Sequence, residues 1–314
     1  MGVYDHGITV LQLLSPVQWV QTFFILAASA VLALTFLPSR TRRLLLDYGA
    51  RGGSRPSAAA AGGDWLETIT ATVTSWGQIP HSWFAAFYAT SLAGSAFWAY
   101  QFAFQGEILR LVASTQVANG SEANGQSLVA VKVAWALMAV QGARRLFEQL
   151  FVLESSTSKM WIVHWALGLS FYIFMSVAVW IQGSGSIIDQ WSKPNDGHGP
   201  GLNVLTGSVM FFMASVTQFR CHSHLASLKK YSLPTEGLFQ YTICAHYTCE
   251  CLIYISLAIA AAPEGQLFNK TILSGLVFVA VNLGLTAHGT RKWYETKFGA
   301  DKVASRWTMI PLVY

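Results

Sequence analysis

Long apolar runs dominate this chain, and short polar segments separate them. A helix that crosses a bilayer needs roughly 20 apolar residues, and runs of about that length recur along the sequence. The pattern predicts about seven transmembrane helices, over residues 17–37, 81–104, 127–143, 160–182, 201–219, 243–262 and 270–290. The third is the weakest, because Lys132 lies inside it. We therefore expect an all-α polytopic membrane protein.

The composition agrees with a lipid environment. The chain has 314 residues, of which 53% are hydrophobic and 11% charged, whereas soluble domains are about 25% charged. The net charge of +5 does not indicate nucleic acid, because the basic residues flank apolar runs instead of forming a basic face. The first apolar run is too long for a cleavable signal and is expected to remain as an anchor.

Most basic residues fall in four polar segments, which predicts the orientation of the spans. Segments 38–80, 144–159, 220–242 and the tail after 290 are rich in Lys and Arg. Such segments mark the cytosolic side, so we expect a lumenal N-terminus and a cytosolic C-terminus. The two N-glycosylation sequons, at Asn119 and Asn269, fall in loops expected to be lumenal, which is modest support.

The chain reads as one continuous membrane domain. Residues 1–126 hold the first spans and a flexible cytosolic loop over 38–80, because residues 50–63 are rich in Gly, Ala and Ser. Residues 127–314 hold the later spans, which gather polar residues where each is costly. There are three such clusters: Gln218-Phe-Arg220-Cys221-His222 with Lys229-Lys230-Tyr231, Cys244-Ala-His246-Tyr247-Thr-Cys249-Glu250-Cys251, and His288-Gly-Thr290-Arg291-Lys292-Trp293-Tyr294.

Each cluster has a structural and a functional interpretation. His246 and Glu250 are four residues apart and share a helix face, so they form either a pair that closes a helix end or a polar floor for a ligand. The basic residues near His222 form either an ordinary cytosolic loop or an anion site. Zinc is disfavoured, because Cys249 and Cys251 lack the spacing of structural zinc sites. The chain has no G-x-G-x-x-G or Walker loop, so any nucleotide is held in another way.

Several motifs together resemble a known family over about residues 130–314. They are Arg144-Arg145-Leu-Phe-Glu148, Gln218-Phe-Arg-Cys-His222, Phe239-Gln-Tyr-x-x-Cys-Ala-His246-Tyr247-x-x-Glu250, Trp293-Tyr294-x-x-Lys297-Phe298 and the ending Ile310-Pro311-Leu312-Val313-Tyr314. The chain resembles the steroid 5-alpha-reductase family, and in particular its polyprenol-reductase branch in the fungal form. The resemblance implies seven transmembrane helices, the endoplasmic-reticulum membrane, and NADPH as hydride donor. It also implies a place in dolichol biosynthesis, which supplies the lipid carrier for protein N-glycosylation.

The resemblance also implies roles for individual residues. Eight positions match the cofactor side of the family: Gln218, His222, Lys229, Tyr231, His246, Glu250, Arg291 and Tyr294. Candidates for polarising the substrate oxygen are Tyr247, His246, Tyr294 and Tyr231, while Glu250 is expected to orient the nicotinamide or His246. The chain departs from the steroid-reducing branch at Gly142, where that branch has a Tyr. It also has Ser232 where the family has an Arg, and Arg291 where the polyprenol branch often has a His.

Elementary chemistry favours an aldehyde substrate. A hydride adds only to a polarised alkene, and the developing enolate oxygen needs a donor, so we expect polyprenal rather than polyprenol to be reduced. The expected partners are thus a long polyisoprenoid and the bilayer, without nucleic acid or metal. Rival interpretations are a steroid or enoyl-thioester reductase, an isoprenylcysteine-type methyltransferase, and a non-catalytic scaffold or carrier.

Overall fold

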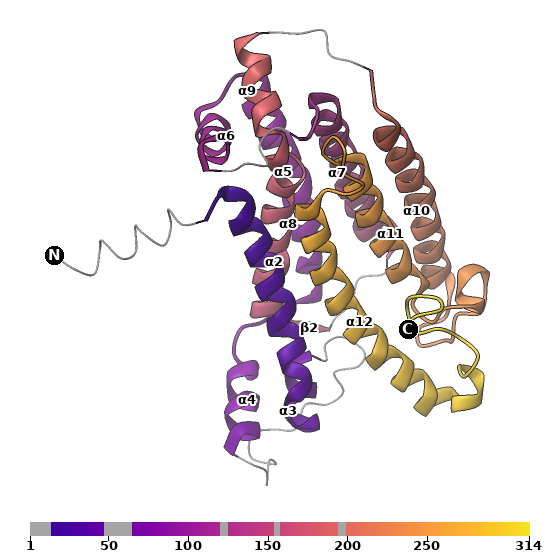
Figure 1. The fold of residues 1–314 in the computed structure, drawn as a ribbon. Helices are drawn as coiled ribbons and strands as arrows, with labels where there is room; N and C mark the ends of the chain where they lie inside the picture. Colours follow the sequence, from indigo (N-terminus) through magenta and orange to yellow (C-terminus); the bar gives the residue numbers. More distant parts are fainter. Residues whose placement is uncertain (1–13, 47–64, 120–124, 154–157, 194–198) are drawn as a thin grey trace, which may run out of the picture.

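The computed structural model of the chain describes residues 14–46, 65–119, 125–153, 158–193 and 199–314, which form an α-helical bundle (Figure 1). The α-helices are α2 (Pro16–Ala33), α3 (Ser39–Leu46), α4 (Trp65–Ser75), α5 (Ala85–Ala103), α6 (Glu107–Asn119), α7 (Leu128–Phe147), α8 (Ile162–Ala178), α9 (Ser184–Ser192), α10 (Leu202–Ser227), α11 (Ala245–Ala260) and α12 (Lys270–Phe298). Two short strands, β1 (Gln78–Pro80) and β2 (Lys159–Trp161), pair antiparallel. The predicted all-α class is confirmed.

Four regions are long and apolar enough to cross a membrane: Pro16–Phe36, Ile162–Ser192, Leu202–Ser227 and Lys270–Phe298. They support a multi-pass membrane protein. The spans expected at 81–104, 127–143 and 243–262 correspond to α5, α7 and α11, which are shorter or more polar. Since α11 has 16 residues and α7 carries Lys132, Arg144 and Arg145, their crossing of the bilayer stays a prediction.

Some segments that the sequence pattern treats as loops contain helices. Residues 38–80 hold α3, α4 and β1, while the part expected to be most flexible, 50–63, lies outside the described residues. The segment between the second and third expected spans holds α6. That helix is too short and too polar to span, but Leu109 and Ala113 on one of its faces are fully buried. An amphipathic helix of this kind has no long apolar run to reveal it.

Asn269 is not available for glycosylation in this fold. It has no exposed surface, its side-chain oxygen accepts hydrogen bonds from the amides of Thr271 and Ile272, and its amide nitrogen donates to the carbonyl of Ala261. These bonds cap the N-terminus of α12, which satisfies two of the amides that a helix start leaves free. The sequon at Asn269 therefore does not support the predicted orientation.

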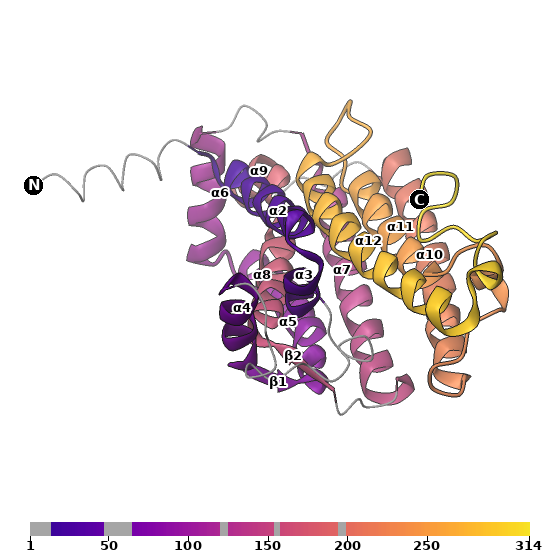
Figure 2. The ribbon, with the colours of Figure 1, turned by 90° about the horizontal axis from the view of Figure 1, so that it is seen from below.

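Glycines set how closely the helices approach one another. A Cβ atom added at Gly207 on α10 would lie 2.5 Å from the amide nitrogen of Ala260 on α11. One added at Gly142 on α7 would lie 3.0 Å from the hydroxyl of Ser91 on α5. Figure 2 shows α12 running beside α2 on one side and beside α11 on the other, with α10 next to α11. These glycines thus allow close contacts between α5 and α7 and between α10 and α11.

The two ends of the bundle differ in what they carry. Figure 1 shows α3, α4 and the C-terminal ends of α10 and α12 at one end, and α6 and α9 at the other. The basic segments 220–242 and 291–314 therefore share an end with α3. The polar clusters found in the sequence begin at this same end.

Candidate active site

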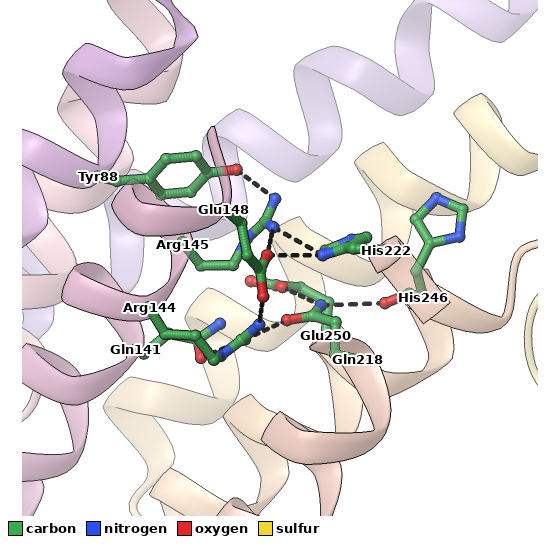
Figure 3. Close-up of polar contacts among 9 residues, drawn as sticks. All are labelled: Tyr88, Gln141, Arg144, Arg145, Glu148, Gln218, His222, His246 and Glu250. Carbon is green, nitrogen blue, oxygen red and sulfur yellow. Dashed lines mark hydrogen bonds and ion pairs between the residues drawn. The ribbon is translucent and has the colours of Figure 1, made fainter. Parts of the chain in front are cut away.

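A buried carboxylate, Glu148, lies at the centre of a polar network between α7, α10 and α11 (Figure 3). It accepts hydrogen bonds from the guanidinium groups of Arg144 and Arg145, and its Oε2 lies 2.7 Å from Nδ1 of His222. Glu148 begins η5 (Glu148–Val152), a π-helical turn that continues α7. Such turns occur frequently at functional sites. A buried carboxylate needs partners of this kind, because its desolvation is otherwise very costly.

Helical spacing brings the members of this network together. Gln141, Arg144, Arg145 and Glu148 follow the spacing i, i+3, i+4 and i+7, so they lie on one face of the α7–η5 segment. Pairs four residues apart on the facing helices complete the network: Gln218 with His222 on α10, and His246 with Glu250 on α11. Three helices thus contribute polar side chains to one level of the bundle.

Gln218 joins the three helices. Its Nε2 donates to Oε2 of Glu250 at 2.5 Å and to the carbonyl of His246 at 3.1 Å, while its Oε1 accepts from Arg144. A pair that closes the helix end would require a hydrogen bond between the side chains of His246 and Glu250. The structure shows no such bond between these two described residues. The amide of Gln218 contacts both of them instead.

His246 has an unused polar atom. Its Nδ1 is buried and has no hydrogen-bond partner among the residues that the structure describes. The ring lies 4.1 Å from that of Tyr247 and 5.6 Å from that of His222, measured between centroids. Buried polar atoms are nearly always satisfied, so this nitrogen is a candidate contact for a ligand.

Arg145 extends the network to α5. Its Nη2 donates to the hydroxyl of Tyr88 at 2.6 Å, and its guanidinium carbon lies 4.7 Å from the centre of the Tyr88 ring. Tyr88 is only 6% exposed. The phenol oxygen of Tyr88 thus accepts a charge-assisted hydrogen bond, which ties α5 to the network.

Glu148 is ionised at neutral pH and is therefore not a proton donor there. Burial alone would raise the pKa of its carboxyl group, but the hydrogen bond with His222 and the charges of Arg145, His222 and Arg144 lower it to about 2. The carboxylate therefore stays ionised at neutral pH. Its role in the network is to fix the guanidinium and imidazole groups around it.

A second group of predicted residues lies at the end of the bundle. Lys229 and Tyr231 follow the end of α10 and are exposed. Tyr231 has a positive φ of 70°, and its carbonyl accepts from Nζ of Lys297 at 2.8 Å. The same Lys297 ammonium lies 5.0 Å from the centre of the Tyr231 ring and 4.7 Å from that of Trp293. These side chains form a basic aromatic surface.

Arg291 binds the C-terminal tail. Its guanidinium donates to the carbonyls of Arg306 at 2.7 Å and Val303 at 3.3 Å, and it pairs with Glu295 at 3.0 Å. With Arg306, Trp307 and Tyr314 it lines a pocket of about 310 Å³. Its donors hold the tail, so any contact with a cofactor would be an addition to this role.

The tail also meets the start of α11. The amides of Ile243 and Cys244 donate to the carbonyls of Trp307 and Thr308, at 2.8 and 3.1 Å. Tyr294 is 9% exposed and packs against Trp293 and Phe298. The tail thus covers the same end of the bundle as Lys229 and Tyr231.

The structure divides the eight predicted cofactor residues into two groups. Gln218, His222, His246 and Glu250 lie in or beside the buried network, while Lys229, Tyr231, Arg291 and Tyr294 lie at the outer end. Sequence reasoning did not select five network members as site residues: Tyr88, Gln141, Arg144, Arg145 and Glu148. Two arginines within one turn of a glutamate, at the end of an apolar run, were a usable signal. For Tyr88 there was none, because the sequence does not tell which helix α5 faces.

Comparisons with known proteins place these eight residues within a matched family region. The profile of the family described as 3-oxo-5-alpha-steroid 4-dehydrogenase matches residues 158–314, which include α10, α11 and α12. "Polyprenal reductase 2" of Oryza sativa subsp. japonica is 28% identical, over 98% of this chain and 99% of the relative. "Polyprenal reductase" of Saccharomyces cerevisiae is 35% identical, over 54% of this chain and 60% of the relative. "Polyprenal reductase" of Xenopus tropicalis is 28% identical, over 59% of this chain and 62% of the relative.

Proposed function

Because the chain belongs to the 3-oxo-5-alpha-steroid 4-dehydrogenase (steroid 5-alpha-reductase) family, we propose that it is an NADPH-dependent polyprenal reductase. It reduces the α-isoprene double bond of a long polyprenal in the endoplasmic-reticulum membrane. The saturated product then enters dolichol biosynthesis and serves as the lipid carrier for N-glycosylation. The names of relatives from rice, yeast and frog support the aldehyde over the alcohol as the group beside the reduced bond.

The buried network is the observation that carries this proposal. A membrane scaffold has no need of a fully buried carboxylate, two arginines and two histidines at one level of the bundle. The unpartnered Nδ1 of His246 and the Gln218–Glu250 pair beside it provide the hydrogen-bonding groups that a nicotinamide amide requires. The exposed amines of Lys229 and Lys297 near Tyr231 suit the phosphates.

The residues present therefore fit NADPH. Gln218, His246 and Glu250 would hold its nicotinamide half, and Lys229, Tyr231 and Arg291 its phosphate half. When bound, this cofactor supplies the hydride. The chain's own task is to place the enal, to exclude water, and to stabilise negative charge that develops on the aldehyde oxygen.

The arrangement of the helices supports seven spans with a lumenal N-terminus. The basic segments after α10 and after α12 share one end of the bundle with α3 (Figure 1), as a cytosolic face requires. In this orientation, NADPH reaches the network from the cytosol while the isoprenoid chain stays in lipid. Protease protection of tags placed after residue 119 and after residue 230 tests it, because only the first tag should be protected in sealed microsomes.

One assay decides the reaction. Purified protein is incubated with NADPH and either polyprenal or polyprenol, and loss of the α-double bond is followed by mass spectrometry together with NADPH oxidation. We expect reduction of the aldehyde only. Substitution Glu250→Gln should slow single-turnover hydride transfer, as should Tyr247→Phe if Tyr247 polarises the aldehyde. A wild-type protein that binds S-adenosylmethionine and leaves NADPH unoxidised would instead favour a methyltransferase.

A further inference from the structure

The helix α4 and the residue that follows it carry a stripe of exposed apolar side chains. The stripe, called the α4 stripe below, consists of Trp65, Ile69, Val73 and Trp76, which are 70%, 52%, 44% and 71% exposed. These residues follow the spacing i, i+4, i+8 and i+11, so they lie along one side of the helix. In water, two indole rings and two branched side chains would remain unburied. A contiguous apolar surface of this kind indicates contact with lipid or with another protein.

The opposite side of α4 is polar and faces the protein. The buried residues of this helix are Glu67, Thr70 and Thr74, and α3 packs beside it at the periphery of the bundle (Figure 2). The carboxylate of Glu67 lies 3.8 Å from the guanidinium of Arg40 on α3, and the hydroxyl of Thr74 donates to the carbonyl of Thr70 at 2.8 Å. Helices that face lipid turn their polar groups toward the protein in the same way.

Two candidate spans determine the level of α3 and α4 in the bundle. The helix α3 starts at Ser39, shortly after the candidate span Pro16–Phe36 ends. Directly after the α4 stripe, a Cβ added at Gly77 would lie 2.7 Å from the side chain of Ile162. Ile162 is the first residue of the candidate span Ile162–Ser192. The stripe therefore lies level with the ends of two spans, where a bilayer meets water.

The outer surface of α3 is positively charged. Arg40 and Arg43 are three residues apart, so they share one side of the helix, and both are exposed. Glu67 is the only acidic residue of α4, and it is 9% exposed. Because this carboxylate is turned inward, the two arginines present their charge to the surroundings beside the apolar stripe.

We propose that α3 and α4 form a lipid-binding surface at the membrane interface. The α4 stripe inserts among the lipids, and Arg40 and Arg43 bind the phosphate groups of anionic phospholipids. Tryptophan at both ends of the stripe suits the level of the headgroups. In the proposed orientation this surface meets the cytosolic leaflet, which holds the anionic lipids. The inference rests on the proposed function for the choice of leaflet, but not for lipid binding.

The charge of this surface favours lipid over a second copy of the chain. A twofold contact through the α4 stripes would use the same patch of both copies. It would bring Arg40 and Arg43 of each copy toward those of the other, while the inward Glu67 offers them little compensation. A phospholipid instead supplies hydrocarbon beside the stripe and a negative charge beside the arginines.

The stripe is tested with a dye that reports contact with lipid. The full-length variant Ile69→Cys is labelled with a solvatochromic dye, since the native cysteines are buried, and is placed in nanodiscs of phosphatidylcholine and phosphatidylserine. We expect blue-shifted emission that lipids brominated on the upper acyl chain quench. Val73→Cys is a second position on the stripe. The control is Lys302→Cys, an exposed residue of the tail, which aqueous iodide should quench instead.

Two results of this experiment would overturn the proposal. Emission at Ile69 and Val73 like that at Lys302 would mean that the stripe faces water. Blue-shifted emission that brominated lipids leave unquenched would mean that it contacts protein, either a second copy or a partner. Neither result depends on NADPH or an enal, so a failure of the proposed reductase activity would be seen separately.

The arginines are tested by lipid binding to the full-length protein. Native mass spectrometry in detergent gives the affinity for added phosphatidylserine and phosphatidylcholine. We expect Arg43→Gln to weaken phosphatidylserine binding by about fivefold, the effect of one basic residue near an anionic surface, and to leave phosphatidylcholine binding unchanged. Lys302→Gln removes the same charge from the tail and should change neither. Equal effects of the two substitutions on phosphatidylserine would overturn the role of the arginines.

Discussion

Replacing Glu148 by glutamine removes the one negative charge that is fully buried between Arg144 and Arg145. The side chains of these two arginines are 15% and 12% exposed, so water can solvate their positive charges only weakly. Removing one partner of a buried ion pair typically costs 3–5 kcal/mol. Because the arginines keep slight exposure and glutamine retains an acceptor oxygen, we take about 3 kcal/mol. At about 2 °C per kcal/mol for a large domain, Tm should fall by about 6 °C.

The control for this prediction is an ion pair at the edge of the bundle. Arg291 and Glu295 form an i, i+4 pair whose side chains are 24% and 35% exposed. Such pairs contribute about 0.3–0.5 kcal/mol, so Glu295→Gln should move Tm by about 1 °C at most. Both variants are compared with the wild type by thermal unfolding in one detergent. Equal shifts would refute the reasoning that buried charge in this network stabilises the bundle.

Three further outcomes are expected. Gly207→Ala should lower the free energy of unfolding by about 1–3 kcal/mol, because the added Cβ would lie 2.5 Å from the Ala260 backbone. Gly284→Ala is the control: its Cβ would meet no atom within 4 Å, so thermal unfolding should show a neutral or slightly stabilising effect. The pKa of Glu148 is lowered from 4.5 to about 2, so the ionised carboxylate contributes its full stabilisation of the fold above pH 4.5 and loses it as pH falls toward 2. The Tm difference between wild type and Glu148→Gln should therefore shrink between pH 4.5 and pH 2. A constant Tm difference would contradict this. Arg291→Gln should release the tail and speed hydrogen exchange at the Ile243 amide, which donates to Trp307; unchanged exchange would mean that the tail is held without Arg291.

The sequence was sufficient for much of the fold but for only part of the site. Hydropathy alone predicts all four regions of the described residues that are long and apolar enough to span, because such runs depend on local composition. It did not find α6 or α9, which are short helices stabilised by packing. Within the candidate site, spacing placed His246 and Glu250 on one face, but it could not reveal that Gln218 from another helix bonds to both positions.

Tyr88 illustrates a more general limit. Its position depends on how α5 packs against α7, and a single sequence contains no direct signal of which helices are neighbours. In the sequence, the Gly142 that permits this packing differs from its neighbours only as a departure from the steroid-reducing branch. The absent tyrosine and the close approach of α5 are consequences of the same small residue.

The network around Glu148 also determines where this chain can be truncated, or joined to a relative in a chimera, without losing buried hydrogen bonds. Residue 158 marks the start of the family match, yet Arg144, Arg145 and Glu148 lie before it and bond to Gln218 and His222 after it. A fragment starting at residue 158 would lose these partners and expose the polar face of α10. A chimera joined there would work only if both parents share the arginine–glutamate face. The helices before residue 158 can therefore be exchanged only together with the partners that Gln218 and His222 require.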